Sequence, residues 1–306
     1  MKKISAYIPF FLFLFLFFSA GCSQKNISSD EPPVYTPLQV LVPQADKTEI
    51  LGNSPVTLDV SNKNLGYMIV QADTSVSGIN VQMTGPDGIL YSYFLDSGEN
   101  AVIPFTGGDG SYQILCYQKI SGDKYAAVSS HTLEISLENP FLPFLYPNQY
   151  VNFSPESNAC LLAQTMLPDD ASDLDGLDAV YNYVISNITY DEAKARNVES
   201  GYLPDIDETL SSGTGICFDY AALMTAMLRA RDIPCKLQIG YTSDIKHAWI
   251  DVYIRSKGWI NHAISFDGET WSRMDPTFDS GADADNEEQI QEYIGDGDNY
   301  TVQFTR

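Results

Sequence analysis

A change in the spacing of apolar residues limits the fold of this chain more than any other feature. Between residues 55 and 137, short β-rich runs are separated by turn residues at intervals typical of a sandwich. Beyond residue 150 the apolar residues recur at the helical period, and strand-like stretches return near Cys235. A chain of 306 residues with 44% apolar content can bury two ordinary cores. The sequence therefore predicts an all-β domain followed by an α+β domain.

The β-rich half contains seven stretches that we expect to form strands. They are Val56 to Val60, Gly66 to Ala72, Asn80 to Thr84, Leu90 to Leu95, Ala101 to Phe105, Tyr112 to Gln118 and Tyr125 to Ser136. This pattern fits an immunoglobulin-like sandwich, with turn signals at residues 85–88 and 107–110. No catalytic cluster is evident here, so we expect a spacer or a binding module. Tyrosines at alternate positions either fill the core or line a sugar or peptide groove, and they are Tyr67, Tyr91, Tyr93, Tyr112 and Tyr117.

The second half is expected to contain three long helices and an antiparallel sheet. The helices are expected at Ser154 to Leu167, Asp173 to Asn187 and Cys217 to about Asp232. Pro155 suits the first helical position, and Arg229 and Arg231 suit the negative end of the third helix. The strands are expected at Cys235 to Gly240, His247 to Ile254, Trp259 to Ile264 and Trp271 to Met274.

Cys217 lies where a glycine-broken turn, Gly213 to Ile216, runs directly into an apolar helical pattern. Unpaired backbone N–H groups and the positive end of the helix dipole meet at such a position, and both favour a thiolate. A thiolate is the nucleophilic form of cysteine, so Cys217 is a candidate catalytic nucleophile. The alternative is a buried cysteine that packs as a small hydrophobic residue.

His247 opens a stretch in which polar and apolar residues alternate. The alternation places His247, Trp249 and Asp251 on one face of a strand and the apolar residues on the other. A histidine at the edge of a sheet can act as general base toward a nucleophile on a packed helix. Asp275, in Met274-Asp275-Pro276-Thr277, adds a carboxylate that could orient the imidazole.

These three segments, in this order and spacing, resemble the transglutaminase-like superfamily of papain-like thiol enzymes. The resemblance covers about residues 145 to 280 and implies a papain-like core with helices packed on an antiparallel sheet. It assigns the nucleophile to Cys217, the general base to His247 and the orienting carboxylate to Asp275. It also suggests that the Tyr190 hydroxyl joins the backbone N–H of Cys217 in stabilising an oxyanion. His262 is a rival base, but it lacks the strand-edge position.

A thiolate–imidazolium pair attacks an amide or ester carbonyl and leaves a thioester. Attack by water makes a peptidase or amidase, and attack by a lysine amine makes a cross-linking transglutaminase. We expect hydrolysis of protein or peptide substrates, in a groove shaped by loops at Glu199 to Ser212 and Asn261 to Glu269. The alternatives are a catalytically inactive surface module that binds peptide or cell-wall polymer, and an adhesin or spacer carried by the β-rich half.

The start of the chain has the features of an export signal. Lys2 and Lys3 precede an apolar run from Tyr7 to Phe18, which is shorter than the roughly twenty residues that span a bilayer. Ser19-Ala20-Gly21-Cys22 resembles a bacterial lipobox, although Ser19 stands where Leu is usual. The resemblance implies that Cys22 carries a lipid and anchors the protein to the outer face of the cell membrane.

The expected organisation is a signal peptide at 1–22, a flexible linker at 23–48, a β-sandwich at 49–140 and a catalytic domain at 141–306. The net charge of −23 becomes −25 when Lys2 and Lys3 leave with the signal, so nucleic acid is not an expected partner. The expected partners are a protein or peptide substrate, the membrane through the lipid anchor, and the cell wall through the β-sandwich.

We expect no cofactor and no metal. The sequence has no Cys-x-x-Cys or His-rich spacing that would indicate zinc. The acidic stretch from Asp279 to Asp298 is expected to be a solvated surface, because Asp283-x-Asp285 lacks the rest of a calcium-loop pattern.

Overall fold

The computed structural model describes residues 38–242, 244–261, 264–266, 271–273 and 300–306. Pro37–Arg306 is one compact unit. Its described buried residues gather into two hydrophobic cores, one within residues 56–135 and the other formed by Val40 and residues within 151–254. The predicted order of an all-β sandwich followed by an α+β core is confirmed. The domain boundaries at residues 48 and 140 stay predictions.

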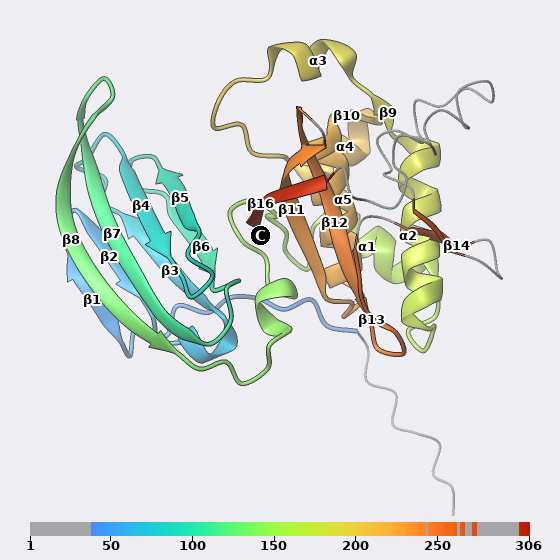
Figure 1. The fold of residues 1–306 in the computed structure, drawn as a ribbon, viewed down its shortest axis with the longest axis horizontal. Helices are drawn as coiled ribbons and strands as arrows, with labels where there is room; N and C mark the ends of the chain where they lie inside the picture. Colours follow the sequence, from blue (N-terminus) through green and yellow to red (C-terminus); the bar gives the residue numbers. More distant parts are fainter. Residues whose placement is uncertain (1–37, 243, 262–263, 267–270, 274–299) are drawn as a thin grey trace, which may run out of the picture. The chain divides into compact units, whose positions relative to one another are not determined.

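The sandwich has two antiparallel four-stranded sheets that enclose one core (Figure 1). The first sheet contains, in spatial order, β1 (Ile50–Asn53), β2 (Val56–Asp59), β3 (Tyr67–Ala72) and β6 (Asn100–Pro104). The second contains β5 (Leu90–Leu95), β4 (Ile79–Thr84), β7 (Gly110–Ser121) and β8 (Lys124–Ile135). Strand β1 was not predicted, because it is mostly exposed, lacks an alternating pattern and contains Gly52 at a φ of 73°.

The alternating tyrosines of the sandwich mainly fill its interior. Tyr67, Tyr91, Tyr93 and Tyr112 are each at most 2% exposed, so they do not line a groove, and Tyr117 alone of the five is half-buried. The Tyr112 hydroxyl donates to the Gly108 carbonyl at 2.9 Å, four residues upstream. This contact resembles the tyrosine corner of immunoglobulin-like sandwiches.

Five α-helices follow the sandwich in the described chain. They are α1 (Asn158–Met166), α2 (Asp173–Asn187), α3 (Glu192–Asn197), α4 (Ile206–Ser212) and α5 (Cys217–Arg229). Helix α2 matches its prediction, except that Ser172 rather than Asp173 is the N-cap and forms a capping box with Asp175. Helix α5 begins at Cys217 as predicted.

The predicted start of α1 at Ser154 is wrong. Residues 154–157 form a turn in which the Ser157 N–H donates to the Ser154 carbonyl at 3.1 Å, and the helix begins at Asn158. The carboxylate of Asp207, from α4, accepts the first two N–H groups of α1 at 3.0 Å each. Because this cap comes from α4, a distant segment of the chain, the helix begins at Asn158 rather than at Ser154.

The expectation of a loop at Glu199 to Ser212 is also wrong in its second half, because α4 occupies residues 206–212. Asp205 caps this helix by accepting the N–H groups of Asp207 and Glu208, and Gly213 ends it in the left-handed conformation at a φ of 66°. Strong capping at both ends stabilises a short helix that has little apolar periodicity.

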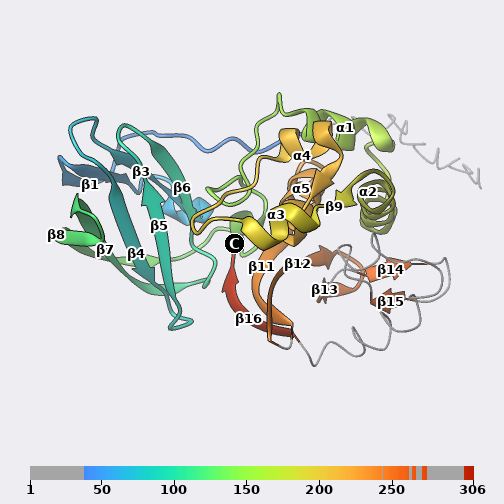
Figure 2. The same ribbon diagram turned by 90° about the horizontal axis from the view of Figure 1, so that it is seen from above.

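A four-stranded antiparallel sheet supports α5. Its order is β13 (Gly258–Ile260), β12 (Ile245–Ile254), β11 (Cys235–Thr242) and β16 (Tyr300–Thr305). Figure 2 shows β16 beside β11 at one edge of this sheet. Strand β16 was not predicted. The stretch predicted as one strand from Trp259 to Ile264 is divided, because β14 (Ile264–Phe266) pairs with β15 (Trp271–Arg273) instead.

The alternation predicted for β12 is confirmed. Ala248, Ile250 and Val252 belong to the same core as the buried residues of α5, so His247 and Trp249 fall on the opposite face of the strand. Helix α5 is buried along all of residues 219–229 rather than on one face only. It is therefore the central helix of this core.

Two arginines near the end of α5 act differently from what the dipole argument predicts. Arg229 is 2% exposed and donates to the carbonyls of Cys235, Tyr146 and Arg306. Arg231 donates to the carbonyls of Ala163, Leu167 and Pro168, at the end of α1. Both side chains thus connect α5 to other segments by satisfying buried carbonyls.

None of the helices in the described part of the chain is long and apolar enough to cross a membrane.

Candidate functional site

Cys217 is the first residue of α5 and is partly exposed. The other cysteines that the structure describes, Cys116, Cys160 and Cys235, are buried. Burial raises the pKa of the Cys160 and Cys235 thiols to about 12 and also raises the pKa of Cys116. Among the described cysteines, only Cys217 therefore combines access to solvent with a helix N-terminus.

The turn before Cys217 is closed by the carboxylate of Asp219. Its Oδ2 accepts the N–H of Ile216, the N-cap residue, at 2.8 Å, and Asp219 is fully buried. Gly215 makes room for this carboxylate, because a Cβ at Gly215 would lie 2.7 Å from the Cβ of Asp219. Any larger residue at position 215 would therefore crowd Asp219, which explains why a glycine lies four residues before this aspartate.

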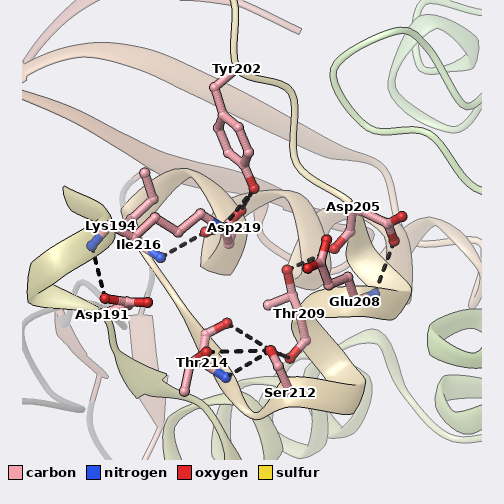
Figure 3. A network of polar contacts seen from close by, with 10 residues as sticks. All are labelled: Asp191, Lys194, Tyr202, Asp205, Glu208, Thr209, Ser212, Thr214, Ile216 and Asp219. Carbon is pink, nitrogen blue, oxygen red and sulfur yellow. Dashed lines mark hydrogen bonds and ion pairs between the residues drawn. The ribbon is translucent and has the colours of Figure 1, made fainter. Parts of the chain in front are cut away.

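Asp219 also binds two side chains from the segment that contains α3 (Figure 3). The Tyr202 hydroxyl donates to Oδ1 at 2.6 Å, and the Lys194 ammonium lies 2.7 Å from Oδ2. Lys194 Nζ donates to the Tyr202 oxygen at 2.7 Å as well. Lys194, Tyr202 and Asp219 therefore each contact the other two, next to the turn that precedes Cys217.

The pKa values of both Lys194 and Tyr202 are raised above their ordinary values. Partial burial acts to lower the pKa of Lys194, but the hydrogen bonds to Asp219 and Tyr202 outweigh it and raise that pKa. Burial and the hydrogen bond to Asp219 raise the pKa of Tyr202 to about 12. Lys194 is thus held as a cation and Tyr202 as a neutral donor at neutral pH.

A hollow of about 450 Å³ lies next to these two side chains. It is lined by Lys194, Tyr202 and residues 197–201. The loop that was predicted to shape the substrate groove begins at Glu199, and its first residues line this hollow.

Tyr190, the predicted oxyanion residue, lies beside the turn that precedes Cys217. Strand β9 (Thr189–Tyr190) pairs in parallel with β10 (Thr214–Gly215), and Tyr190 is the partner of Gly215. The N–H of Asp191 donates to the Gly215 carbonyl at 2.8 Å and extends this pairing. The position suits the predicted role, which stays a prediction.

His247 is 5% exposed and lies opposite Gly240 of β11. Its ring is stacked near that of Trp249, with 6.3 Å between centroids and an interplanar angle of 18°. The Tyr300 ring of β16 also lies 6.3 Å away. The imidazole therefore lies near two aromatic rings on the face predicted for it.

Further along this face, a row of polar contacts crosses the sheet. The Gln238 amide donates to Asp251 Oδ2 at 2.6 Å, and the Thr305 hydroxyl donates to Gln238 Oε1 at 2.8 Å. Asp251 is 7% exposed. The row joins β12, β11 and β16, and it was not predicted because β16 was not.

Asp275, Cys22 and His262 lie outside the described residues. The assembly of Cys217, His247 and Asp275 into a triad stays a prediction, as does the lipid attachment at Cys22. Among the described residues, no group of three or more His, Cys, Asp or Glu side chains could hold a metal ion.

The contacts of Asp219 with Lys194 and Tyr202 were not predicted. An acidic residue three positions after an N-cap is a known helix-start signal, so Asp219 was detectable. Nothing in the sequence indicates that Lys194 and Tyr202 would reach this carboxylate from a separate segment.

Residues 162–276 match the family model of the transglutaminase-like superfamily. The matched region contains Cys217, His247 and Asp275, so the predicted resemblance to that superfamily is confirmed. No curated protein matches the sequence.

Several solved structures are similar to the chain. A protein from Cytophaga hutchinsonii proposed to be a cysteine protease is 16% identical, with 75% of this chain and 68% of that one covered and a TM-score of 0.34. The periplasmic domain of TgpA from Pseudomonas aeruginosa is 16% identical, with 82% and 80% covered and a TM-score of 0.35.

Proposed function

We propose that this chain is a thiol enzyme that hydrolyses amide bonds in protein or peptide substrates. The observation that supports this most is the superfamily match over residues 162–276, together with a partly exposed Cys217 at the first residue of α5. In the proposal Cys217 is the nucleophile, His247 the general base and Asp275 the residue that orients the imidazole.

The proposed reaction has two steps. The Cys217 thiolate attacks the carbonyl carbon, the C–N bond breaks, and His247 gives its proton to the departing amine, which leaves a thioester. Water then attacks the thioester and loses a proton to His247, the C–S bond breaks, and the products are a carboxylic acid and the regenerated thiolate. The backbone N–H of Cys217 and the hydroxyl of Tyr190 would stabilise the oxyanion in both steps.

The location of the enzyme is part of the proposal. The N-terminal apolar run and the lipobox-like residues before Cys22 support export and a lipid anchor on the outer face of the bacterial cell membrane. The β-sandwich would then serve as a spacer or as a contact with the cell wall.

A peptide library can test the activity and identify the acceptor. Cleavage is measured beside incorporation of an amine probe, for the wild type, Cys217→Ala and His247→Gln. His131→Gln is the matched control, because His131 is a partly buried histidine of β8 in the sandwich. We expect cleavage to exceed amine incorporation, and both to disappear in the Cys217 and His247 variants only.

Two results would contradict the proposal. Amine incorporation without cleavage would make the chain a cross-linking transglutaminase. Peptide binding with no turnover, equal in the wild type and in Cys217→Ala, would favour the inactive binding module.

A further inference from the structure

The carboxylate of Asp219 is unusual because it is fully buried only two residues after the candidate nucleophile. A buried carboxylate is costly unless it is paired and hydrogen-bonded. Asp219 meets both conditions with the Ile216 N–H, the Tyr202 hydroxyl and the Lys194 ammonium (Figure 3). Of these partners, only Ile216 adjoins α5.

Among the residues that the structure describes, the cation paired with Asp219 comes from α3. The Lys194 side chain is 31% exposed, whereas that of Asp219 is 0% exposed, so the ion pair lies at the boundary of the core. Other acids drawn in the same view are engaged elsewhere. Asp191 accepts the Lys194 N–H at the start of α3, and Asp205 accepts the N–H groups of Asp207 and Glu208 in α4.

We propose that Asp219 is a positioning residue for Cys217 and that Lys194, supported by Tyr202, cancels its negative charge so that the thiolate is not repelled. This inference rests on the proposed function of Cys217 as a nucleophile. Asp219 fixes the N-cap of α5 through the Ile216 N–H, which a neutral residue of the same shape could also do in part. The carboxylate also adds a negative charge two residues along the chain from Cys217, and a like charge disfavours a thiolate. Lys194 offsets that charge.

The test is the pH dependence of Cys217 alkylation by iodoacetamide, followed by peptide mapping between pH 5 and 9. Lys194→Met keeps the length of the side chain and removes the cation. We expect the midpoint of the rate profile to rise by about one pH unit, which is roughly a tenfold slower reaction at pH 6. Arg196→Met is the matched control, because Arg196 lies on the same helix and pairs with Glu192 at 69% and 70% exposure.

Further variants separate charge from structure. Lys194→Arg keeps a cation, and the double variant Lys194→Met with Asp219→Asn removes both charges, so each should return the midpoint to near the wild-type value. Tyr202→Phe keeps both charges and should leave the midpoint unchanged while lowering the melting temperature. A purely structural role would lower the melting temperature in Lys194→Met without moving the midpoint.

The proposal is overturned if Lys194→Met and Arg196→Met have the same midpoint, or if the double variant keeps the raised midpoint. The measurement needs no substrate. If the chain cleaves no peptide, the function proposed above fails, whereas the coupling of Lys194 to Cys217 is decided separately by the alkylation profiles.

Discussion

Replacement of Gly215 by alanine would test how tightly the turn before Cys217 is packed. The added Cβ would lie 2.7 Å from the Cβ of Asp219 and 3.3 Å from both Asp219 Oδ2 and Thr209 Cγ2. Asp219 is fully buried and Thr209 is 3% exposed, so neither can move into solvent. Overpacking of this kind costs about 1–3 kcal/mol. Displacement of Asp219 would add the loss of its contact with the Ile216 N–H, roughly 1.5–3 kcal/mol for a bond to a charged group.

We therefore expect Gly215→Ala to lower the free energy of unfolding by about 2.5–6 kcal/mol. Urea denaturation measures this change, and the iodoacetamide reaction of Cys217 reports on the turn itself. Gly176→Ala is the matched control, because its Cβ would also meet a side-chain atom at 2.7 Å, but that atom is the flexible Cδ1 of Ile233 in another part of the core. The control should change stability less and leave the Cys217 reaction unchanged. A loss below 1 kcal/mol with unchanged reactivity in Gly215→Ala would refute the packing argument.

Three further predictions concern the core and its titration. Arg229→Met leaves the carbonyls of Cys235, Tyr146 and Arg306 without their buried donor. Urea denaturation should therefore show that the free energy of unfolding falls by at least about 3 kcal/mol. A fall of less than about 1 kcal/mol would contradict the donor role. In the native protein iodoacetamide should leave Cys116, Cys160 and Cys235 unmodified and should reach them in urea, as mapped by mass spectrometry, because burial raises the pKa of all three. Burial raises the pKa of Tyr91 and Tyr202 to about 12, above their ordinary value of 10, so their contribution to stability is complete below pH 10 and is lost as the pH rises toward 12. Thermal melts across that range should show the decline, with a smaller slope in Tyr202→Phe, and an equal slope would count against a role for Tyr202.

Local patterns in the sequence were sufficient for most of the framework. The alternation in β12 followed from the two-residue period of a strand. The start of α5 at Cys217 and the extent of α2 followed from glycine and capping signals, since such signals act within a few residues of one another. The seven predicted strands of the sandwich were defined by turn residues in the same way.

Contacts between distant segments could not be predicted. The start of α1 depends on Asp207, about fifty residues further along the chain, and no local pattern encodes that contact. Strand β16 has only exposed or partly buried side chains and is held by pairing with β11, so its own sequence shows little burial pattern. The ion pair of Lys194 with Asp219 joins two segments whose approach depends on the tertiary fold. In each case the partner, rather than the local sequence, decides the structure.

The most direct test of the central claim is the rate of iodoacetamide modification at pH 6 to 7 in the wild type, Cys217→Ala and His247→Gln. If Cys217 is an activated thiol paired with His247, the wild type should be labelled rapidly at this one site, Cys217→Ala should lose that label, and His247→Gln should be labelled many times more slowly. Equal, slow labelling of all three proteins would contradict the assignment of Cys217 as a catalytic nucleophile.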